Sequence, residues 1–448
     1  MLAQAQEGAA APPATRGPGP VARLRAAGRT PPGRLRAAAA VLVALVLLFG
    51  TAGLWQSANR SAASGGLVSR SEPLSQDAAE IYRSLADADT TAAAGFLLAG
   101  QEPPALRKRY QDDLATAARL ISEAAARTGS TGGDAQLRLA ELNQQLPRYA
   151  GLVDTARAAN REGLPLGGAY LRYASGLMQQ TILPTAQKLA DSEAAALDEE
   201  YDRAAATPWL SLALGVLALG ALARYQVLLF RRTNRVFNPG LLAASLAVLT
   251  ALVWLGAGAA AAGGSLHDAR VQGIHPLRQL NQVRVEALQA HTAENLNLVS
   301  RGATDAYTQR WDQLAKELTG PAGQAGSVDG LSQSPPNAAR AQLADARKAF
   351  GDWQDRHAQA AGKDADGDYE AALGLTLSAD GGDTADTAFG AAEQKWAAAE
   401  QAEQGAFEAA AGGVDTVLAV QAAAVALLAA LAAAGTVRGI GRRLAEYR

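Results

Sequence analysis

The stretch LLAASLAVLTALVWLGAGAAAA, residues 241–262, contains no charged residue over a length sufficient to cross a membrane. A helix of about 20 apolar residues spans the roughly 30 Å hydrocarbon core of a bilayer. A buried core helix of a soluble domain usually runs shorter and shows a polar stripe, which this stretch lacks. Three more uncharged stretches have the same character, at about 37–55, 205–223 and 416–435. We therefore predict four transmembrane helices, of which the last is Ala-rich and only weakly hydrophobic.

The first apolar stretch follows a proline-rich head, residues 1–36, whose composition favours disorder. A cleaved signal peptide has a short basic segment and an apolar core of about 7–15 residues. Here the preceding segment is longer and the apolar stretch reaches the length of a full span. We therefore expect a retained anchor rather than a cleaved signal.

Arginines are concentrated in three short pieces, residues 1–36, 224–240 and 436–448, which together carry fourteen arginines and two acids. The two long segments between the spans are net acidic, with 15 basic and 19 acidic residues in 56–207 and 12 basic and 21 acidic residues in 264–413. Because basic residues in short loops stay on the cytoplasmic side, we expect a multi-pass protein of the cell membrane. Its termini and connector would be cytoplasmic, and both long segments would lie outside.

The connector contains Arg231, Arg232 and Arg235, and the sequence leaves two interpretations of them open. They dock a cytoplasmic partner protein, or they only fix the topology and attract anionic membrane lipid. Both interpretations place the three guanidinium groups on the cytoplasmic side.

Catalytic and metal-binding motifs are missing from the sequence. The chain has no cysteine, and its four histidines lack metal-ligand spacing. DADGDYEA (364–371) resembles the start of a calcium loop, but Tyr369 stands where that loop needs Gly and Leu375 where it needs Glu, which favours a helix start or a loop. We expect no enzymatic activity, no cofactor, no bound metal and no nucleic-acid partner.

Similar segments recur about 200 residues apart. PLSQDAAEIYRSLADADTTAAAGFLLAG (73–100) and PLRQLNQVRVEALQAHTAENLNLVSRG (276–302) both begin with Pro-Leu and end at Gly. RKRYQDDL (107–114) corresponds to TQRWDQL (308–314), and LPRYAGL (146–152) corresponds to FGDWQDR (350–356). We interpret the chain as a tandem duplication of one unit, made of a span, an outer domain and a span.

The first outer domain, residues 56–204, shows alternating spacings of four and three between apolar residues, which predict packed helices. We expect four of them, over 73–100, from Pro103-Pro104, from an N-cap at Asp134 with a kink at Pro147, and over about 168–204. The fourth can continue straight into the second span. The second domain, residues 263–415, repeats this pattern with exposed loops at 320–337 and 378–387.

The predicted fold class is thus an all-α integral membrane protein. It has four transmembrane helices and two extracytoplasmic helical-bundle domains in a tandem duplication.

Polar residues stand at the same level in the first helix of each predicted bundle. Asp87 and Thr90, with their neighbours Asp89 and Thr91, occupy this level in the first domain, and His291 and Asn295 occupy it in the second. They form either a polar pocket for a small ligand or a partner's loop, or a hydrogen-bonded layer inside the bundles. In the fourth span, Gln421 could hydrogen-bond another span or reach lipid headgroups.

The predicted cytoplasmic pieces are too short to hold an output domain, so we expect a separate cytoplasmic protein to respond to movements of the helices. The organisation and the stretch SEPLSQDAAEIYRSLADADTTAAAGFLLAG (71–100) resemble the actinobacterial GlnX-like family of four-span membrane signalling proteins. The resemblance implies a signalling relay in nitrogen metabolism. Its implied partners are an extracytoplasmic solute-binding lipoprotein for glutamate, aspartate or glutamine and a cytoplasmic Ser/Thr kinase.

The alternative is a four-span permease-like or transport-associated subunit that works with a cytoplasmic ATPase. Transport pathways usually need ionisable residues or broken helices near the bilayer midplane. The predicted spans offer only Arg224, at an inner end. This pattern favours the relay, and a purely structural scaffold is the third interpretation.

Overall fold

The computed structural model describes residues 31–66, 71–98, 102–128, 133–233, 238–320, 325–333, 339–377, 382–411 and 414–445, and these are helical throughout apart from short turns. No strand occurs among them, which confirms the predicted all-α class. The chain divides into two compact units. The span unit contains residues 1–58, 208–259 and 419–448, and the bundle unit contains residues 59–207 and 260–418.

Among the described residues, four helices are long and apolar enough to cross a membrane, by length and composition, and they coincide with the four predicted spans over most of their length. The second of these apolar runs contains three residues that are not helical, 206–208. The third helix also extends well beyond its predicted span. The helices are α2 (Pro31–Gly66), α8 (Trp209–Thr233), α9 (Pro239–Ala269) and α16 (Val414–Ala445).

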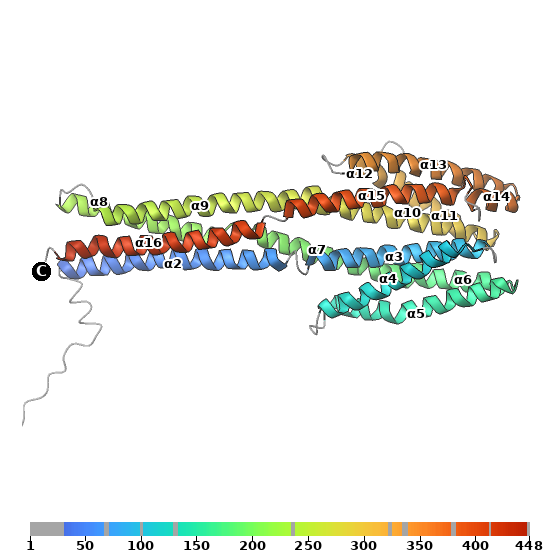
Figure 1. The fold of residues 1–448 in the computed structure, drawn as a ribbon, viewed down its shortest axis with the longest axis horizontal. Coiled ribbons are helices and arrows are strands. Elements are labelled where there is room, and N and C mark those ends of the chain that lie inside the picture. The colour runs from blue at the N-terminus through green and yellow to red at the C-terminus, as the bar shows by residue number, and fades with distance from the viewer. Residues whose placement is uncertain are drawn as a thin grey trace, which may run out of the picture. The chain divides into compact units, whose positions relative to one another are not determined.

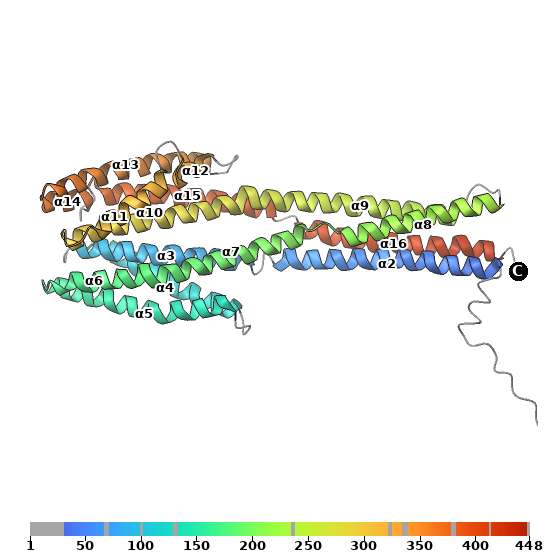
Figure 2. The same ribbon diagram turned by 180° about the vertical axis from the view of Figure 1, so that it is seen from behind.

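Glycines allow α9 and α16 to approach closely in the span unit, where the helices lie lengthwise beside one another (Figure 2). A Cβ atom on Gly240 would lie 2.6 Å from Cα of Gly439 and 2.7 Å from the carbonyl oxygen of Gly435. The Asn238 amide donates to the Gly439 carbonyl at 2.6 Å. At the other end of this contact, Gln421 Nε2 donates to the Leu255 carbonyl at 2.8 Å. Gln421 therefore bonds another span, as one of its two sequence interpretations states.

The first bundle of the bundle unit, called bundle 1, has the four helices that the sequence predicts (Figure 1). Asp134 is the first helical residue of the third helix and Gly133 precedes it as the N-cap, so the predicted cap is one residue off. The helices are α3 (Glu72–Leu97), α4 (Pro104–Thr128), α5 (Asp134–Arg161) and a long fourth helix formed by α6 (Leu166–Leu177), the π-helical turn η2 (Met178–Ile182) and α7 (Leu183–Ala205).

The fourth helix does not continue straight into the second span, which corrects the prediction. It ends at Ala205, and residues 206–208 are not helical before α8 begins at Trp209. Pro208 explains the break, because proline disfavours the helical conformation of the residue before it. The unbroken helical run lies elsewhere, from Pro239 to Ser300, through α9, the π-helical turn η3 (Arg270–Ile274) and α10 (His275–Ser300).

The second bundle, called bundle 2, repeats the helix order of bundle 1 with more interruptions. A short helix lies inside the predicted loop 320–337, so that segment is not wholly irregular. Asp368 caps the following short helix by accepting a hydrogen bond from the Ala371 amide at 3.2 Å, so the calcium-like motif marks a helix start. After α10 come α11 (Ala306–Thr319), α12 (Ser327–Gln333), α13 (Arg340–Ala365), α14 (Tyr369–Thr376) and α15 (Ala385–Ala411). This common order agrees with a tandem duplication, which remains a prediction from the sequence.

The π-helical turns η2 and η3 each precede a proline near the start of the next helix. Pro184 follows η2 and Pro276 follows η3. Proline has no amide hydrogen and its ring collides with the carbonyl four residues earlier. A wider π turn relieves this collision while the helix continues, and such turns are frequent at functional sites.

Candidate functional site

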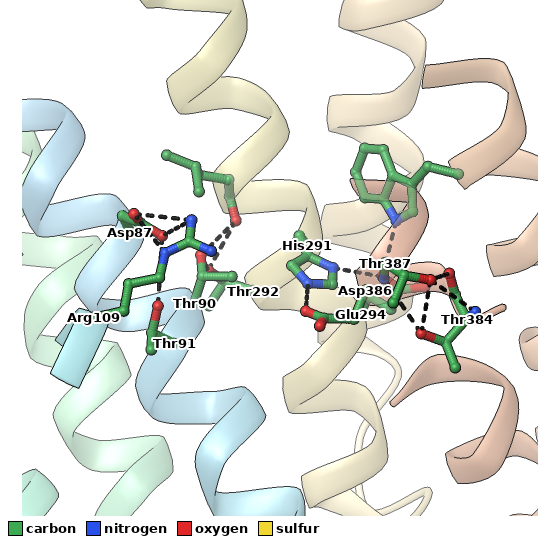
Figure 3. A network of polar contacts seen from close by, with 12 residues as sticks. Asp87, Thr90, Thr91, Arg109, His291, Thr292, Glu294, Thr384, Asp386 and Thr387 are labelled. Carbon is green, nitrogen blue, oxygen red and sulfur yellow. Dashed lines mark hydrogen bonds and ion pairs between the residues drawn. The ribbon is translucent and has the colours of Figure 1, made fainter. Parts of the chain in front are cut away.

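The first helices of the two bundles, α3 and α10, contact each other along a parallel seam. Thr90 Oγ1 lies 2.7 Å from Thr292 Oγ1, and it also donates to the Leu288 carbonyl of α10 at 3.0 Å (Figure 3). Earlier along both helices, Gln289 Nε2 donates to the Tyr82 hydroxyl at 3.2 Å. We call this contact the α3–α10 seam, and it joins bundle 1 to bundle 2 through buried polar groups.

The composition of α3 explains how the seam can be so close. Every residue from Ser84 to Gly95 is buried, because α3 packs against α4 and α7 as well as α10. A helix that is covered on all sides needs small residues wherever a neighbour approaches. Five alanines meet that need, at positions 86, 88, 92, 93 and 94.

Asp87 does not face the seam but bonds within bundle 1, turned away from His291 (Figure 3). Its carboxylate receives bonds from Arg109 of α4 at 2.8 and 3.1 Å, and Arg83 lies 4.0 Å away. Burial, followed by the negative charge of Asp87, raises the pKa of the neighbouring Asp113 to about 8. Asp113 therefore binds its proton more tightly than an exposed aspartate does.

His291 faces the interior of bundle 2. Its Nδ1 lies 2.8 Å from Glu294 and its Nε2 lies 3.1 Å from Asp386 of α15 (Figure 3). The His291 ring stacks on Phe389. Burial alone would lower the pKa of His291, but the bonds to Asp386 and Glu294 outweigh it and raise the pKa to about 9. Both ring nitrogens then carry protons, and His291 is a buried cation.

Glu294 is the centre of this buried ionic cluster. Beside His291, it accepts bonds from His357 Nδ1 at 2.8 Å and from Trp353 Nε1 at 3.1 Å, both on α13. Burial opposes its ionisation, but the bonds from the two histidines prevail and lower the pKa of Glu294 to about 2. The cluster ties α10 to α13 and α15 inside bundle 2.

The remaining predicted site residues are Asn295 on α10 and the three arginines of the connector. Asn295 is fully buried, and neither of its amide atoms has a hydrogen-bond partner in the described part of the chain. Arg231 is exposed in the last turns of α8, where Arg232 is also helical, and Arg235 lies outside the described residues. The structure thus brings Thr90 to the seam while Asp87 and His291 bond within separate bundles.

Open space lies beside the seam, along the N-terminal halves of α3 and α10. One cavity of about 670 Å³ is bounded by α3, α7, α10 and α11, and another of about 630 Å³ by α3, α10 and α15. Asn281 lines both cavities. Neither is lined by Asp87, Thr90, His291 or Asn295, so these two cavities lie next to the predicted polar layer and not within it.

Several residues of this region were not singled out from the sequence. Glu294 stands three positions after His291 on the same helix, a spacing that places the two side chains on one face and could have revealed the pair. Arg284 of α10 is buried and bonds Glu393 and Glu400 of α15. No local signal in the sequence connects residues that lie more than a hundred positions apart.

The two bundles also share a buried acid that bonds an aromatic donor of the third helix. In bundle 1, Tyr149 of α5 donates to Asp89 at 3.2 Å, and in bundle 2, Trp353 of α13 donates to Glu294 at 3.1 Å. Tyr149 and Trp353 are the aromatic residues of the corresponding sequences LPRYAGL and FGDWQDR. The neighbours differ, because the other two donors to Asp89 are neutral, whereas Glu294 has two histidines.

No curated protein and no solved structure matches this chain. One family model does, the one described as an actinobacterial sensor domain, and the match covers residues 63–202. That range contains the last residues of α2 and nearly all of bundle 1, from α3 through most of α7. The chain is therefore a helical membrane protein with candidate membrane spans, whose bundle 1 is similar to an actinobacterial sensor domain.

Proposed function

We propose that this protein is a non-enzymatic transmembrane signalling relay. It would couple an extracytoplasmic binding protein for glutamate, aspartate or glutamine to a cytoplasmic Ser/Thr protein kinase. The observation that carries the relay is the α3–α10 seam, in which the sensor-like bundle 1 bonds the first helix of bundle 2. The amino-acid ligand and the kinase rest on the resemblance to the GlnX-like family.

The seam offers a way for a binding event to become a change in helix position. A ligand or a partner segment that enters a cavity beside α3 and α10 would alter the spacing of their N-terminal halves. Packed helices typically shift by about 1–2 Å in such transitions. In our proposal α10 passes this shift on, because the helical run from Pro239 to Ser300 is unbroken.

Sidedness is the first requirement of this proposal and can be tested with single cysteines, because the chain has none of its own. We expect Thr155→Cys in bundle 1 and Asp355→Cys in bundle 2 to react with a membrane-impermeant maleimide in intact cells. A cysteine at Arg231 should react only after the membrane is opened. Labelling of Arg231→Cys in intact cells, or protection of either bundle position, would contradict the proposed topology.

The partners require a separate experiment with the full chain in lipid nanodiscs. We expect it to bind a lipid-anchored solute-binding protein loaded with its amino acid and to increase substrate phosphorylation by the kinase. Replacing Arg231, Arg232 and Arg235 together by Lys keeps the charge, and hence the topology, but removes the planar guanidinium groups. Loss of kinase coupling in the Lys variant would show that the three arginines dock the kinase. Full coupling would show that they only fix the topology and contact membrane lipid. Copurification of an ATPase instead of a kinase would favour the transport-associated alternative.

A further inference from the structure

Asp89 carries a buried carboxyl group in the centre of bundle 1 and takes no part in the proposed relay. The residue is only 2% exposed to solvent. Three donors from three elements reach its carboxyl group, namely Ser175 of α6 at 2.7 Å, Tyr149 of α5 at 3.2 Å and Gln179 of η2 at 3.4 Å. All three donors are neutral.

In the described part of the chain, no Arg, Lys or His lies within ion-pair distance of Asp89, so no cation there balances this carboxyl. Arg157 stacks on the Tyr110 ring and pairs with Glu102. Burial raises the pKa values of Tyr110 of α4, Tyr149 of α5 and Tyr307 of α11, and the negative charge of Asp89 adds to the rise at each of these phenols. Among the described residues, the Asp89 carboxylate therefore has hydrogen bonds but no ion-pair partner.

Such an environment favours the protonated acid. Burial raises the pKa of Asp89 to about 6, even though the bonds from Ser175, Gln179 and Tyr149 oppose the rise. Compared with the ordinary value of 3.8, this corresponds to a proton affinity roughly 100-fold higher in the folded protein. Glu294, with two histidine partners, shows the opposite shift, because its pKa is lowered.

Protonation also changes the hydrogen bonds. The ionised carboxyl accepts from Tyr149 on one oxygen and from Ser175 and Gln179 on the other, whereas the protonated acid also carries one O–H donor. Gln179 lies in the π-helical turn before Pro184, where the fourth helix departs from regular α-helical bonding. The group that takes up the proton is therefore hydrogen-bonded to an irregular segment of the fourth helix.

We infer that bundle 1 is an acid-sensing element, in which Asp89 takes up a proton as the medium around the bundle acidifies and thereby stabilises the packing of α3, α5 and the fourth helix. The inference rests on the proposed function only for the side of the membrane on which the proton arrives. Proton uptake itself requires neither the binding protein nor the kinase. Failure of the partner experiments would therefore leave it standing.

The linkage has a definite sign. A carboxyl whose pKa is raised on folding binds its proton more tightly in the folded state, so acidification stabilises the fold. This stabilisation is complete below the ordinary pKa of 3.8 and is lost as the pH rises towards about 6. Asp89→Asn mimics the neutral acid and should remove this component of the pH dependence.

The test uses the full chain in lipid nanodiscs, with thermal unfolding measured from about pH 4.5 to 8. We expect the wild-type melting temperature to fall as the pH rises through about 6, and Asp89→Asn to lack that fall and to melt higher than wild type at about pH 7.5. The matched control is Asp154→Asn, an exposed aspartate on α5, which should retain the wild-type pH dependence. A lower melting temperature of Asp89→Asn at about pH 7.5, with the wild-type pH dependence unchanged, would overturn the inference.

Infrared spectroscopy of the wild-type protein tests the protonation of Asp89 even if the Asp89→Asn variant folds poorly. Wild type should show the carbonyl band of a buried protonated carboxyl at about pH 5, and this band should fade as the pH passes about 6. The protonated Asp113 should give a separate band that fades near pH 8 and persists in the Asp89→Asn variant. A wild-type spectrum without a carboxyl that titrates near pH 6 would contradict the inference.

Discussion

Replacing Glu294 by Gln should lower the free energy of unfolding of the bundle unit by about 3–5 kcal/mol, because it removes the central anion of a buried ionic cluster. Its carboxylate accepts bonds from His291, His357 and Trp353, and its side chain is 3% exposed. Gln has the same shape, but its amide group would point a donor at another donor. The melting temperature of the full chain in nanodiscs should fall by about 5–10 °C.

The pH dependence of this loss of stability follows from the shifted pKa values of Glu294 and His291. The lowered pKa of Glu294 means that its contribution is present above about 4.5 and is lost as the pH falls towards about 2. The raised pKa of His291 means that its contribution is present below about 6.5 and is lost as the pH rises through about 9. The difference between wild type and variant should therefore be full between about pH 4.5 and 6.5.

Glu199→Gln is the matched control, because it makes the same chemical change at an exposed position. Glu199 pairs with Arg203 one helical turn away, and its side chain is 75% exposed. Such surface pairs contribute about 0–1 kcal/mol. Equal melting temperatures of Glu294→Gln and Glu199→Gln would show that the cluster does not stabilise bundle 2.

A leucine at Gly240 should separate the ends of α9 and α16 in the span unit. The added Cβ would lie 2.6 Å from Cα of Gly439, which is backbone and cannot move away by a change of rotamer. The Asn238 bond to the Gly439 carbonyl would be lost with the contact. Overpacking of this kind costs about 1–3 kcal/mol, and the loss of close helix packing adds to it. We expect a lower melting temperature and slower cross-linking between cysteines placed on the facing surfaces of α9 and α16.

The matched control lies on the same helix. A Cβ on Gly256 would meet no atom within 4 Å, so Gly256→Leu makes an identical change where space exists. We expect this variant to behave like wild type within about 0.5 kcal/mol. If Gly240→Leu and Gly256→Leu were equally stable, the close approach of α9 and α16 would not be a feature of the protein.

The sequence was sufficient for the helices because their signals are local. Apolar spacing and Pro103-Pro104 predicted the starts of α3 and α4 to within a few residues, and the uncharged stretches located the candidate spans, although α2, α9 and α16 extend well beyond the predicted ends. The break at 206–208 was missed although Pro208 marks it, because helix-compatible sequence on either side suggested one continuous helix. The short helix α12 was missed because glycines and prolines surround it.

The direction of the polar side chains could not be predicted from the sequence. Of Asp87, Thr90 and His291, only Thr90 bonds the other bundle, and the other two bond inside their own. Which face of a helix meets which neighbour depends on the packing of eight or more segments. A single sequence does not encode that packing in any local pattern. For the same reason Thr292 and His357 could not be assigned as partners before the structure was available.

The relay depends on movement at the α3–α10 seam, and a disulfide lock tests this most directly. Thr90 and Thr292 touch through their hydroxyl groups at 2.7 Å, so Thr90→Cys with Thr292→Cys should form a cross-link in membranes under mild oxidation. Because the chain has no other cysteine, any intramolecular disulfide must join these two positions.

We predict that the cross-linked protein gives a constant kinase output, with or without the amino-acid ligand, and that reduction restores the response. Each single cysteine variant serves as the control and should respond like wild type under the same oxidation. A cross-linked protein that still responds fully to its ligand would show that the signal does not pass through the seam.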